Sequence, residues 1–286
     1  MEFIQNFKQI GSSIMGINER NLNYVYKLNP RKYFDLADDK IKCKEVLQEN
    51  SLACPRTYAS ISRIGDIQMI WQLVSSNKKM AIKPARGAGG NGILILIKSE
   101  DGSWRSHKGP ISESEIFVHM SQIIMGMFSM SDKDKVLIEE YVESHDFFRE
   151  IFPEGVPDIR VIMVSNKPVM AMLRLPTLKS GGKANLHQGG LGIGIDISNG
   201  KLMEAYDGEK YYLQHPDSEK QITGMTLPMW PRLLELSRKT SLAFPLDYLG
   251  IDLVLDKNKG PLIMEINVRP GLAIQLANKK GLKEVL

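Results

Sequence analysis

The sequence DLVLDKNKGPLIMEIN (residues 252–267) consists of two apolar stretches joined by a polar turn, and this pattern predicts a β-hairpin. With the turn placed at residues 257–260, Asp252 lies opposite Glu265 across the antiparallel pair. Because successive side chains of a strand point to opposite faces, Asn267 points the same way as Glu265. Three oxygen-bearing side chains are therefore expected on one face of the hairpin.

Hard oxygen donors of this kind are typical ligands of Mg²⁺, with Mn²⁺ as an alternative ion. Mg²⁺ usually keeps several waters and shares its coordination shell with substrate phosphates. We therefore expect Asp252, Glu265 and Asn267 to bind a metal that accompanies a phosphate ligand. The alternative is a hairpin with one solvated face, which is common in antiparallel sheets. The hairpin by itself does not decide between the two readings.

A second informative stretch is MAIKPARGAGGNGILILI (residues 80–97), in which a strand ends on Lys83 and a glycine-rich loop leads to another strand. Glycines let the backbone approach a polyphosphate closely and turn its N–H groups toward it, and a lysine adds a point charge for phosphate oxygens. The next element is a strand and not a helix, which excludes a Walker loop and a dinucleotide fingerprint. A glycine-rich hairpin turn without a ligand is the alternative. The four glycines are Gly87, Gly89, Gly90 and Gly92.

The loop and the hairpin, in this order and separation, resemble the ATP-grasp superfamily. Three more regions of the chain extend the likeness: VLIEEYV (residues 136–142), PDIRVIMV (157–164) with PVMAMLR (168–174), and GKANLHQGG (182–190). The first of them looks like the hinge strand that hydrogen-bonds adenine. The whole series is similar to the RimK-like α-L-glutamate ligases, a peptide-ligase branch of the superfamily. The resemblance covers roughly residues 36–273.

The resemblance implies an α+β ATP-grasp fold with two lobes that clasp the nucleotide. Residues 40–142 would form the N-lobe with the glycine-rich loop, and residues 143–286 the C-lobe with the metal site. Residues 1–39 would form an N-terminal segment, which is too short for the whole α/β domain that usually precedes the ATP-grasp lobes of glutamate ligases. Within it, residues 18–26 and 29–31 are expected to be ordered.

The activity implied by the resemblance is carboxylate activation. The carboxylate of an acceptor attacks the γ-phosphate of ATP, and an amine then displaces phosphate from the acyl phosphate to leave an amide. Such a ligase would add glutamate or another amino acid to a peptide or a small molecule. Two alternatives stay open: phosphorylation of a small hydroxyl-bearing substrate on the same fold, and an ATP-binding regulatory module without turnover.

The family pattern also implies roles for individual residues. Arg160 and Arg174 would neutralise the transferring phosphoryl group or the acceptor carboxylate, because a planar guanidinium binds both well. Asn185 and Lys83 complete the implied catalytic set. For His187, a contact with phosphate or amine and a structural hydrogen bond are equally open. The implied ATP ligands are Lys40, Lys83, the four glycines, Glu139, Glu140, Tyr141, Val142, Asp158, Lys183, Asn185 and His187.

Two regions depart from the family pattern or leave a role open. An insertion at residues 143–156 follows the hinge strand and carries Phe147, Phe148 and Phe152. We expect this insertion, or another protein, to complete the acceptor site, and exposed aromatics there would favour homo-oligomerisation. Arg269 follows the metal hairpin, where it would bind an acceptor carboxylate or form a surface salt bridge.

Composition restricts the function classes further. The net charge of +4 over 286 residues is too small to argue for nucleic acid as a partner. The cysteines Cys43 and Cys54 have neither metal-ligand spacing nor a disulfide framework, which predicts a cytoplasmic protein. No apolar run reaches the length needed to span a membrane.

Apolar periodicity and capping residues predict five helices, with strands over much of the remaining chain. A serine followed three residues later by a glutamate, Ser112 and Glu115, opens the third of them as a capping box does. The predicted helices span residues 39–50, 67–74, 112 to about 128, 232–243 and 272–285.

Overall fold

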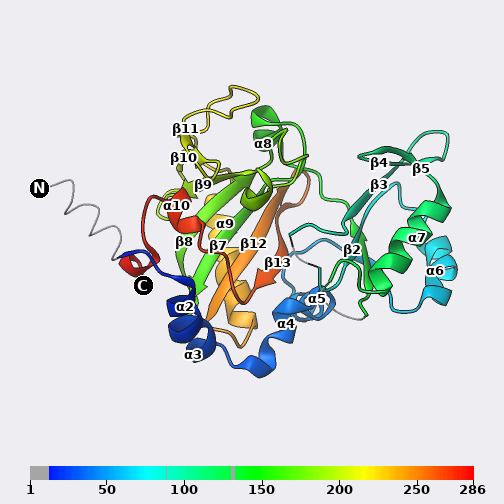
Figure 1. Cartoon of the computed structure of the whole chain (residues 1–286), viewed down its shortest axis with the longest axis horizontal. Coiled ribbons are helices and arrows are strands. Elements are labelled where there is room, and N and C mark those ends of the chain that lie inside the picture. Colours follow the sequence, from blue (N-terminus) through cyan, green and yellow to red (C-terminus); the bar gives the residue numbers. More distant parts are fainter. Residues whose placement is uncertain (1–12, 88, 130–132) are drawn as a thin grey trace, which may run out of the picture. The chain divides into compact units, whose positions relative to one another are not determined.

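The structure is a computed structural model that describes residues 13–87, 89–129 and 133–286 (Figure 1). The chain forms two compact units. Of the described residues, the large unit comprises 13–38, 45–54 and 143–286, and the small unit comprises 39–44, 55–87, 89–129 and 133–142. Helix α5 (Lys40–Glu49) begins in the small unit and ends in the large one.

The small unit is built on a six-stranded antiparallel sheet of order β1-β6-β2-β3-β4-β5. Helices α6 (Ile67–Val74) and α7 (Glu113–Ile124) supply the apolar side chains that cover one face of it. The strands are β1 (Thr57–Ile61), β2 (Lys79–Pro84), β3 (Leu94–Lys98), β4 (Trp104–Ser106), β5 (Gly109–Ile111) and β6 (Val136–Glu140).

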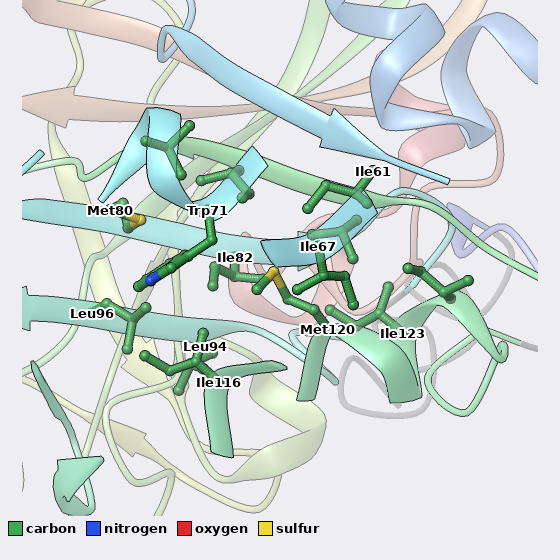
Figure 2. Close-up of a cluster of buried hydrophobic side chains, with 14 of the residues drawn as sticks. Ile61, Ile67, Trp71, Met80, Ile82, Leu94, Leu96, Ile116, Met120 and Ile123 are labelled. Carbon is green, nitrogen blue, oxygen red and sulfur yellow. The ribbon is translucent and has the colours of Figure 1, made fainter. Parts of the chain in front are cut away.

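Alternation along the strands of the small unit separates its apolar core from the residues of the opposite sheet face. Figure 2 shows Met80 and Ile82 of β2 among the buried side chains, together with Trp71 of α6 and Met120 of α7. Because neighbouring residues of a strand point to opposite faces, Lys83 points away from this core. The predicted phosphate lysine is thereby held on the sheet face that the two helices leave uncovered.

The large unit is built on a seven-stranded antiparallel sheet of order β11-β10-β9-β8-β7-β12-β13. Helix α9 (Trp230–Ala243) packs along β7, β8, β12 and β13, and α10 (Ile274–Ala277) contacts β8, β9 and β10 (Figure 1). The strands are β7 (Asp158–Val164), β8 (Lys167–Leu175), β9 (Leu191–Ile195), β10 (Leu202–Tyr206), β11 (Tyr211–Tyr212), β12 (Tyr248–Asp256) and β13 (Gly260–Asn267). The two antiparallel sheets with their helices confirm the predicted α+β fold class.

Most predicted helices are present. Helix α6 has the predicted bounds, α5 is shorter by one residue at each end, and α9 begins two residues earlier, with Pro231 in its first turn. Ser112 and Glu115 form the predicted capping box, but α7 ends at Ile124. The prediction of a C-terminal helix over residues 272–285 is wrong, because α10 covers only Ile274–Ala277 and a 3-10 turn (Leu282–Glu284) follows it. Lys279 has φ +50°, which a continuing right-handed helix does not allow.

The predicted pairing of Asp252 with Glu265 is confirmed, although the turn differs from the prediction. The turn contains residues 257–259 only, because Asp256 pairs with Gly260 and its Oδ1 accepts hydrogen bonds from the N–H groups of residues 258 and 259. The register then shifts by one residue between Asp252 and Leu253, where a β-bulge places Met264 outside the pairing. The bulge compensates for the shorter turn and restores the predicted partners at the open end of the hairpin.

The insertion at residues 143–156 contains helix α8 (Asp146–Ile151), and its aromatic residues are less exposed than predicted. Phe148 and Phe152 are buried, and Phe147 is half-buried. The Phe152 ring stacks on His215 with a centroid separation of 4.6 Å. Because these rings pack inside the large unit, the insertion does not offer the exposed aromatic surface on which homo-oligomerisation was predicted.

The N-terminal segment is ordered as predicted and docks on strand β12. It contains α2 (Ile17–Arg20), the π-helix Asn21–Val25, α3 (Tyr26–Leu28), the 3-10 turn Arg31–Tyr33 and α4 (Asp35–Asp38). The Asn29 side chain donates to the carbonyl of Tyr248 and accepts from its N–H, at 2.7 and 2.9 Å. Arg20 donates to the carbonyl of Pro270 at 2.8 Å. The segment thus contacts both the first residue of β12 and the loop that follows β13.

In the described part of the chain, no helix has both the length and the apolar character that crossing a membrane requires.

The hydroxyl of Tyr248 leads to a prediction, because it is buried and has no hydrogen-bond partner among the described residues. Burial raises the pKa of Tyr248 to about 12 from its ordinary 10, and nearby Arg20 only partly opposes the shift. We expect Tyr248→Phe to raise the free energy of unfolding by about 1 kcal/mol at neutral pH, since it removes an unsatisfied polar group. Urea unfolding measures the change.

The same variant tests the pKa of Tyr248. Between pH 10 and 12 the unfolded state has lost the tyrosine proton while the folded state keeps it, so stability falls over this window by up to about 3 kcal/mol. Tyr248→Phe should lack this decrease. Tyr26→Phe, at an exposed tyrosine of the N-terminal segment, is the control and should keep the decrease. An equal alkaline loss in Tyr248→Phe and the wild type would contradict the interpretation.

Candidate functional site

A cluster of two arginines and two carboxylates lies on one face of the large sheet, where β8, β7, β12 and β13 are neighbours. Arg160 of β7 pairs with Asp252 of β12 and donates to both of its carboxylate oxygens, at 2.7 and 2.6 Å. Arg174 of β8 donates to Asp252 at 2.7 Å and forms a second ion pair with Asp158. The strand order therefore brings together residues up to 94 positions apart in the sequence, Asp158 and Asp252 among them.

The electrostatics of this cluster differ between its two aspartates. Burial opposes ionisation of Asp252, but the attraction of Arg160 and Arg174 outweighs it and holds its pKa below the usual value. Burial raises the pKa of Asp158 to about 6, and the negative charge of Asp252 adds to the increase, although Arg174 opposes it. The attraction of both aspartates also raises the pKa of Arg174, so its guanidinium stays charged.

The remaining predicted metal residues lie on the same face. Glu265 is half-buried opposite Asp252, and the Asn267 amide donates to Asp252 at 3.2 Å. In the part of the chain that the structure describes, no group of three or more His, Cys, Asp or Glu side chains is arranged to hold a metal ion. The donors present are two carboxylates and an amide oxygen, and this set fits Mg²⁺, which commonly uses one or two carboxylates together with phosphates and water.

The glycine-rich loop of the small unit is fixed at both ends. Gly87 packs so closely that a Cβ would lie 2.3 Å from Pro84 Cγ, and at Gly92 a Cβ would lie 2.6 Å from the Phe128 ring. Gly89, Gly90 and Gly92 have φ between +65° and +76°, the left-handed region that glycine adopts without strain. Lys40, the first residue of α5, donates from Nζ to the carbonyl of Gly87 at 2.5 Å.

Lys83 forms a buried ion pair with Glu139 of β6. Lys44 of α5 binds the other oxygen of the same carboxylate at 2.7 Å. Burial opposes ionisation of Glu139, but Lys83 and Lys44 outweigh it and hold its pKa below the usual value. The Glu139 side chain therefore pairs with two lysines. The adenine contact that the resemblance implies for the hinge strand is made by backbone groups, so it stays a prediction.

Lys44 is a residue that the sequence analysis missed. A usable signal was present, because Lys40 and Lys44 are four residues apart on a predicted helix and therefore share one of its faces. The sequence did not indicate which carboxylate forms an ion pair with Lys44, because Glu139 lies on a strand 95 residues away.

The other hinge residues lie at the end of β6. Glu140 is half-buried, and its carboxylate accepts a hydrogen bond from the N–H of Arg56 at 3.2 Å. Tyr141 lies under Lys79, whose Nζ is 5.6 Å from the ring centroid. Val142 is buried. These contacts fix the strand end without assigning a ligand to it.

Four predicted residues lie outside the arginine–carboxylate cluster. Asn185 caps the 3-10 turn Leu186–Gln188 by accepting from the N–H of His187 at 3.0 Å. Among the described residues, neither Lys183, Asn185 nor His187 forms a hydrogen bond or ion pair with the cluster. Arg269 makes a 3.8 Å ion pair with Asp38 and lies over Phe34, as the surface alternative predicted.

Arg174→Met tests the electrostatics of the cluster. Removing one partner from a buried ionic network costs about 3–5 kcal/mol of unfolding free energy. Without Arg174, the pKa of Asp158 should rise above its present value of about 6, because its main attraction is lost and Asp252 remains. A raised folded-state pKa gives stability at low pH that is lost as the pH rises, so the penalty should be larger at pH 8 than at pH 5.5.

Urea unfolding at both pH values measures this difference. Arg238→Met is the matched control, because Arg238 is half exposed and its ion pair with Glu235 lies on the surface of α9. It should cost at most about 1 kcal/mol at either pH. The same penalty for Arg174→Met at pH 5.5 and pH 8 would contradict the assignment.

The sequence pattern of the family described as "Sugar-transfer associated ATP-grasp" matches residues 19–286. A "Probable alpha-L-glutamate ligase" of Pseudomonas putida (strain GB-1) is 24% identical over 249 residues, which cover 87% of this chain and 61% of that protein. A protein of the same description from Shewanella loihica is 24% identical and covers 92% of this chain and 68% of its own length. The chain thus spans about three fifths of the Pseudomonas relative.

Among solved structures, the biotin carboxylase of Campylobacter jejuni in a β,γ-ATP complex superposes with a TM-score of 0.58 and 13% identity, covering 94% of this chain and 49% of that one. At this identity the likeness supports the fold alone.

Proposed function

Because the chain belongs to the sugar-transfer-associated ATP-grasp family, we propose that it is an ATP- and magnesium-dependent ligase that joins a carboxylate to an amine. The observation that carries the proposal is the cluster of Arg160, Arg174, Asp252, Glu265 and Asn267 on four neighbouring strands. It combines hard oxygen donors for a metal with guanidinium groups for a phosphate or a carboxylate in one place.

The proposed reaction has two steps. A carboxylate oxygen of the acceptor forms a bond to the γ-phosphorus of ATP, and the bond to the β,γ-bridging oxygen breaks to release ADP. The amine nitrogen then attacks the acyl carbon, inorganic phosphate leaves, and the nitrogen loses a proton to give the amide. Both reactants of the first step are anions, so charge neutralisation and alignment are the main demands on the protein.

The residues of the large unit answer these demands. Arg160 and Arg174 are already arranged to bind oxygen anions through two N–H groups, and Arg174 remains charged beside two aspartates. Asp252, Glu265 and Asn267 would hold Mg²⁺, which when bound neutralises phosphate oxygens. Since Asp252 now accepts from both arginines, metal binding would require one or more of these hydrogen bonds to be exchanged.

The residues of the small unit would bind the polyphosphate. Lys83 faces away from the core, and Lys40 holds the base of the glycine-rich loop at Gly87. The φ values of Gly89, Gly90 and Gly92 allow backbone N–H groups to line a phosphate. The hinge strand with Glu140, Tyr141 and Val142 is assigned to adenine, and Lys183, Asn185 and His187 to a loop that borders the nucleotide.

The acceptor and the amine belong to broad chemical classes in this proposal. The relatives described as probable α-L-glutamate ligases favour an amino acid such as glutamate as one reactant and a peptide or small molecule as the other. The family description, which links it to sugar transfer, favours a second candidate function, namely phosphorylation of a hydroxyl on a small sugar-like substrate. Release of ADP with one substrate alone distinguishes this reaction from ligation.

The first test is a screen for ADP release with ATP, Mg²⁺ and a panel of carboxylates and amines, followed by mass spectrometry of the products. We expect ADP in stoichiometric amounts only when both a carboxylate and an amine are present, with an amide as product. ADP formed from a hydroxyl compound alone would establish the phosphotransferase. No release with any combination, although ATP binds, would identify a regulatory module.

Glu265→Gln tests the metal assignment in the same assay. It removes one negative oxygen donor from a half-buried position, so the fold should persist while Mg²⁺-dependent turnover falls by at least about 100-fold. Glu235→Gln, at a partly exposed glutamate of α9, is the control and should retain activity. Unchanged turnover in Glu265→Gln would remove Glu265 from the metal site.

A further inference from the structure

Two lysines share one buried carboxylate in the small unit. Lys44, Lys83 and Glu139 have side chains that are 7%, 10% and 2% exposed. Lys44 binds one Glu139 oxygen at 2.7 Å, Lys83 binds the other, and Lys44 also donates to the carbonyl of Pro55 at 2.5 Å. This group of three, the lysine–glutamate trio, is distinct from the arginine–carboxylate cluster of the large unit.

The trio carries an unbalanced charge. Two ammonium groups and one carboxylate leave one excess positive charge in a largely buried place. Burial of a charge without a counter-ion is costly, so such a place favours the approach of an anion. The proposed phosphate ligand of Lys83 is an anion of this kind.

Binding that anion requires an exchange of partners. Lys83 must leave Glu139 to reach a phosphate, because in this structure its ammonium group is held by that carboxylate. If Lys83 were the sole partner of Glu139, its departure would leave a bare charge in a site that is 2% exposed, at a cost of several kcal/mol. The second lysine removes this penalty, because Glu139 keeps one ion pair.

We infer that Lys44 is a positioning residue that holds Glu139, so that Lys83 can exchange this carboxylate for a phosphate of the nucleotide. The inference rests on the proposed function and adds a mechanism for occupancy of the same site. Glu139 then competes with the nucleotide phosphate for the ammonium group of Lys83, and the ion pair between Lys44 and Glu139 determines how strongly Glu139 competes.

The placement of Lys44 suits this function. It lies one helical turn after Lys40, whose Nζ holds the loop at Gly87, and its own Nζ is anchored by Pro55. In the β2–β6 pair, Lys83 lies opposite Leu137 and Glu139 opposite Ala81, so the side chains of Lys83 and Glu139 are diagonal neighbours on one face. Lys83 can therefore move away while Lys44 and Glu139 stay in place.

The competing explanation is that Lys44 only ties α5 to β6. Under that explanation Lys44→Met lowers stability, and a second substitution at Glu139 does not restore the properties of Lys83. The partner-exchange account expects the opposite, because removing the competitor makes its counter-ion unnecessary. A double variant therefore separates the two explanations.

The first measurement follows the acetylation rate of Lys83 by acetic anhydride without nucleotide, read by mass spectrometry. Acetylation requires a neutral, released amine. Lys44→Met leaves Lys83 as the one lysine bound to Glu139 and should slow its acetylation by about tenfold. Glu139→Gln should speed it, and the double variant Lys44→Met/Glu139→Gln should be at least as fast as the wild type.

The second measurement is the affinity for the magnesium complex of a non-hydrolysable ATP analogue, with adenosine as the phosphate-free probe. Lys44→Met should lower the affinity for the analogue by more than about tenfold, and the affinity of the double variant should be within about threefold of the wild-type value. Adenosine binding should be the same in all variants. Lys78→Met, at an exposed lysine before β2, removes one charge as the matched control and should change neither measurement.

The outcomes are distinguishable. The inference is overturned if the double variant keeps the slow Lys83 acetylation and the weak analogue binding of Lys44→Met. It is also overturned if Lys44→Met has the acetylation rate and the analogue affinity of the wild type. If Lys44→Met does not fold, Lys44→Arg and Glu139→Gln decide, with wild-type acetylation expected for the former and faster acetylation for the latter. A wild-type protein that binds no magnesium nucleotide overturns the proposed function, while the acetylation rates still decide the role of Lys44.

Discussion

The carboxylate of Asp252 is the constraint on which the large unit depends. It is 5% exposed and accepts hydrogen bonds from Arg160, Arg174 and Asn267, which come from three different strands. A buried charge is tolerated only when its partners are in place, so any slip of register in β7, β8 or β13 would leave ions unpaired. The same requirement that stabilises the sheet therefore fixes the geometry of the candidate site.

The small unit follows the same physical rule with the opposite sign of charge. Its sheet carries an apolar core on one face (Figure 2). The alternation along β2 and β6 places Lys83 and Glu139 on the other face. In the large unit Arg174 stands between two aspartates, whereas in the small unit Glu139 stands between two lysines. Each arrangement keeps its buried charges paired, and in the proposed function a ligand of the appropriate charge would replace one partner.

The sequence predicted local features well where short-range rules decide them. The apolar spacing of residues 67–74 gave the bounds of α6, and Ser112 with Glu115 gave the start of α7. The pairing of Asp252 with Glu265 was also predicted, but through two compensating errors. The turn is one residue shorter than expected, and the bulge at Met264, which no turn rule reveals, corrects the register.

Contacts that depend on the order of the strands could not be predicted from the sequence. The contact of Arg160 with Asp252 exists because β7 lies beside β12, and no local pattern indicates which strands become neighbours. Lys44 was missed for the same reason, since its partner Glu139 lies on β6. The family resemblance indicated which residues are expected in the site. The structure shows the hydrogen-bond and ion-pair partners of these residues, and these partners determine how much free energy it costs to displace each charged group.

The central claim is that Asp252, Glu265 and Asn267 hold the divalent metal of the nucleotide, and Fe²⁺-directed backbone cleavage tests it most directly. Fe²⁺ replaces Mg²⁺ in the complex with ATP, and peroxide then cuts the chain next to the bound ion. The account predicts nucleotide-dependent cuts beside residue 252 and within residues 265–267, which disappear in Asp252→Asn. Nucleotide-dependent cuts confined to other segments, with these two intact, would contradict it.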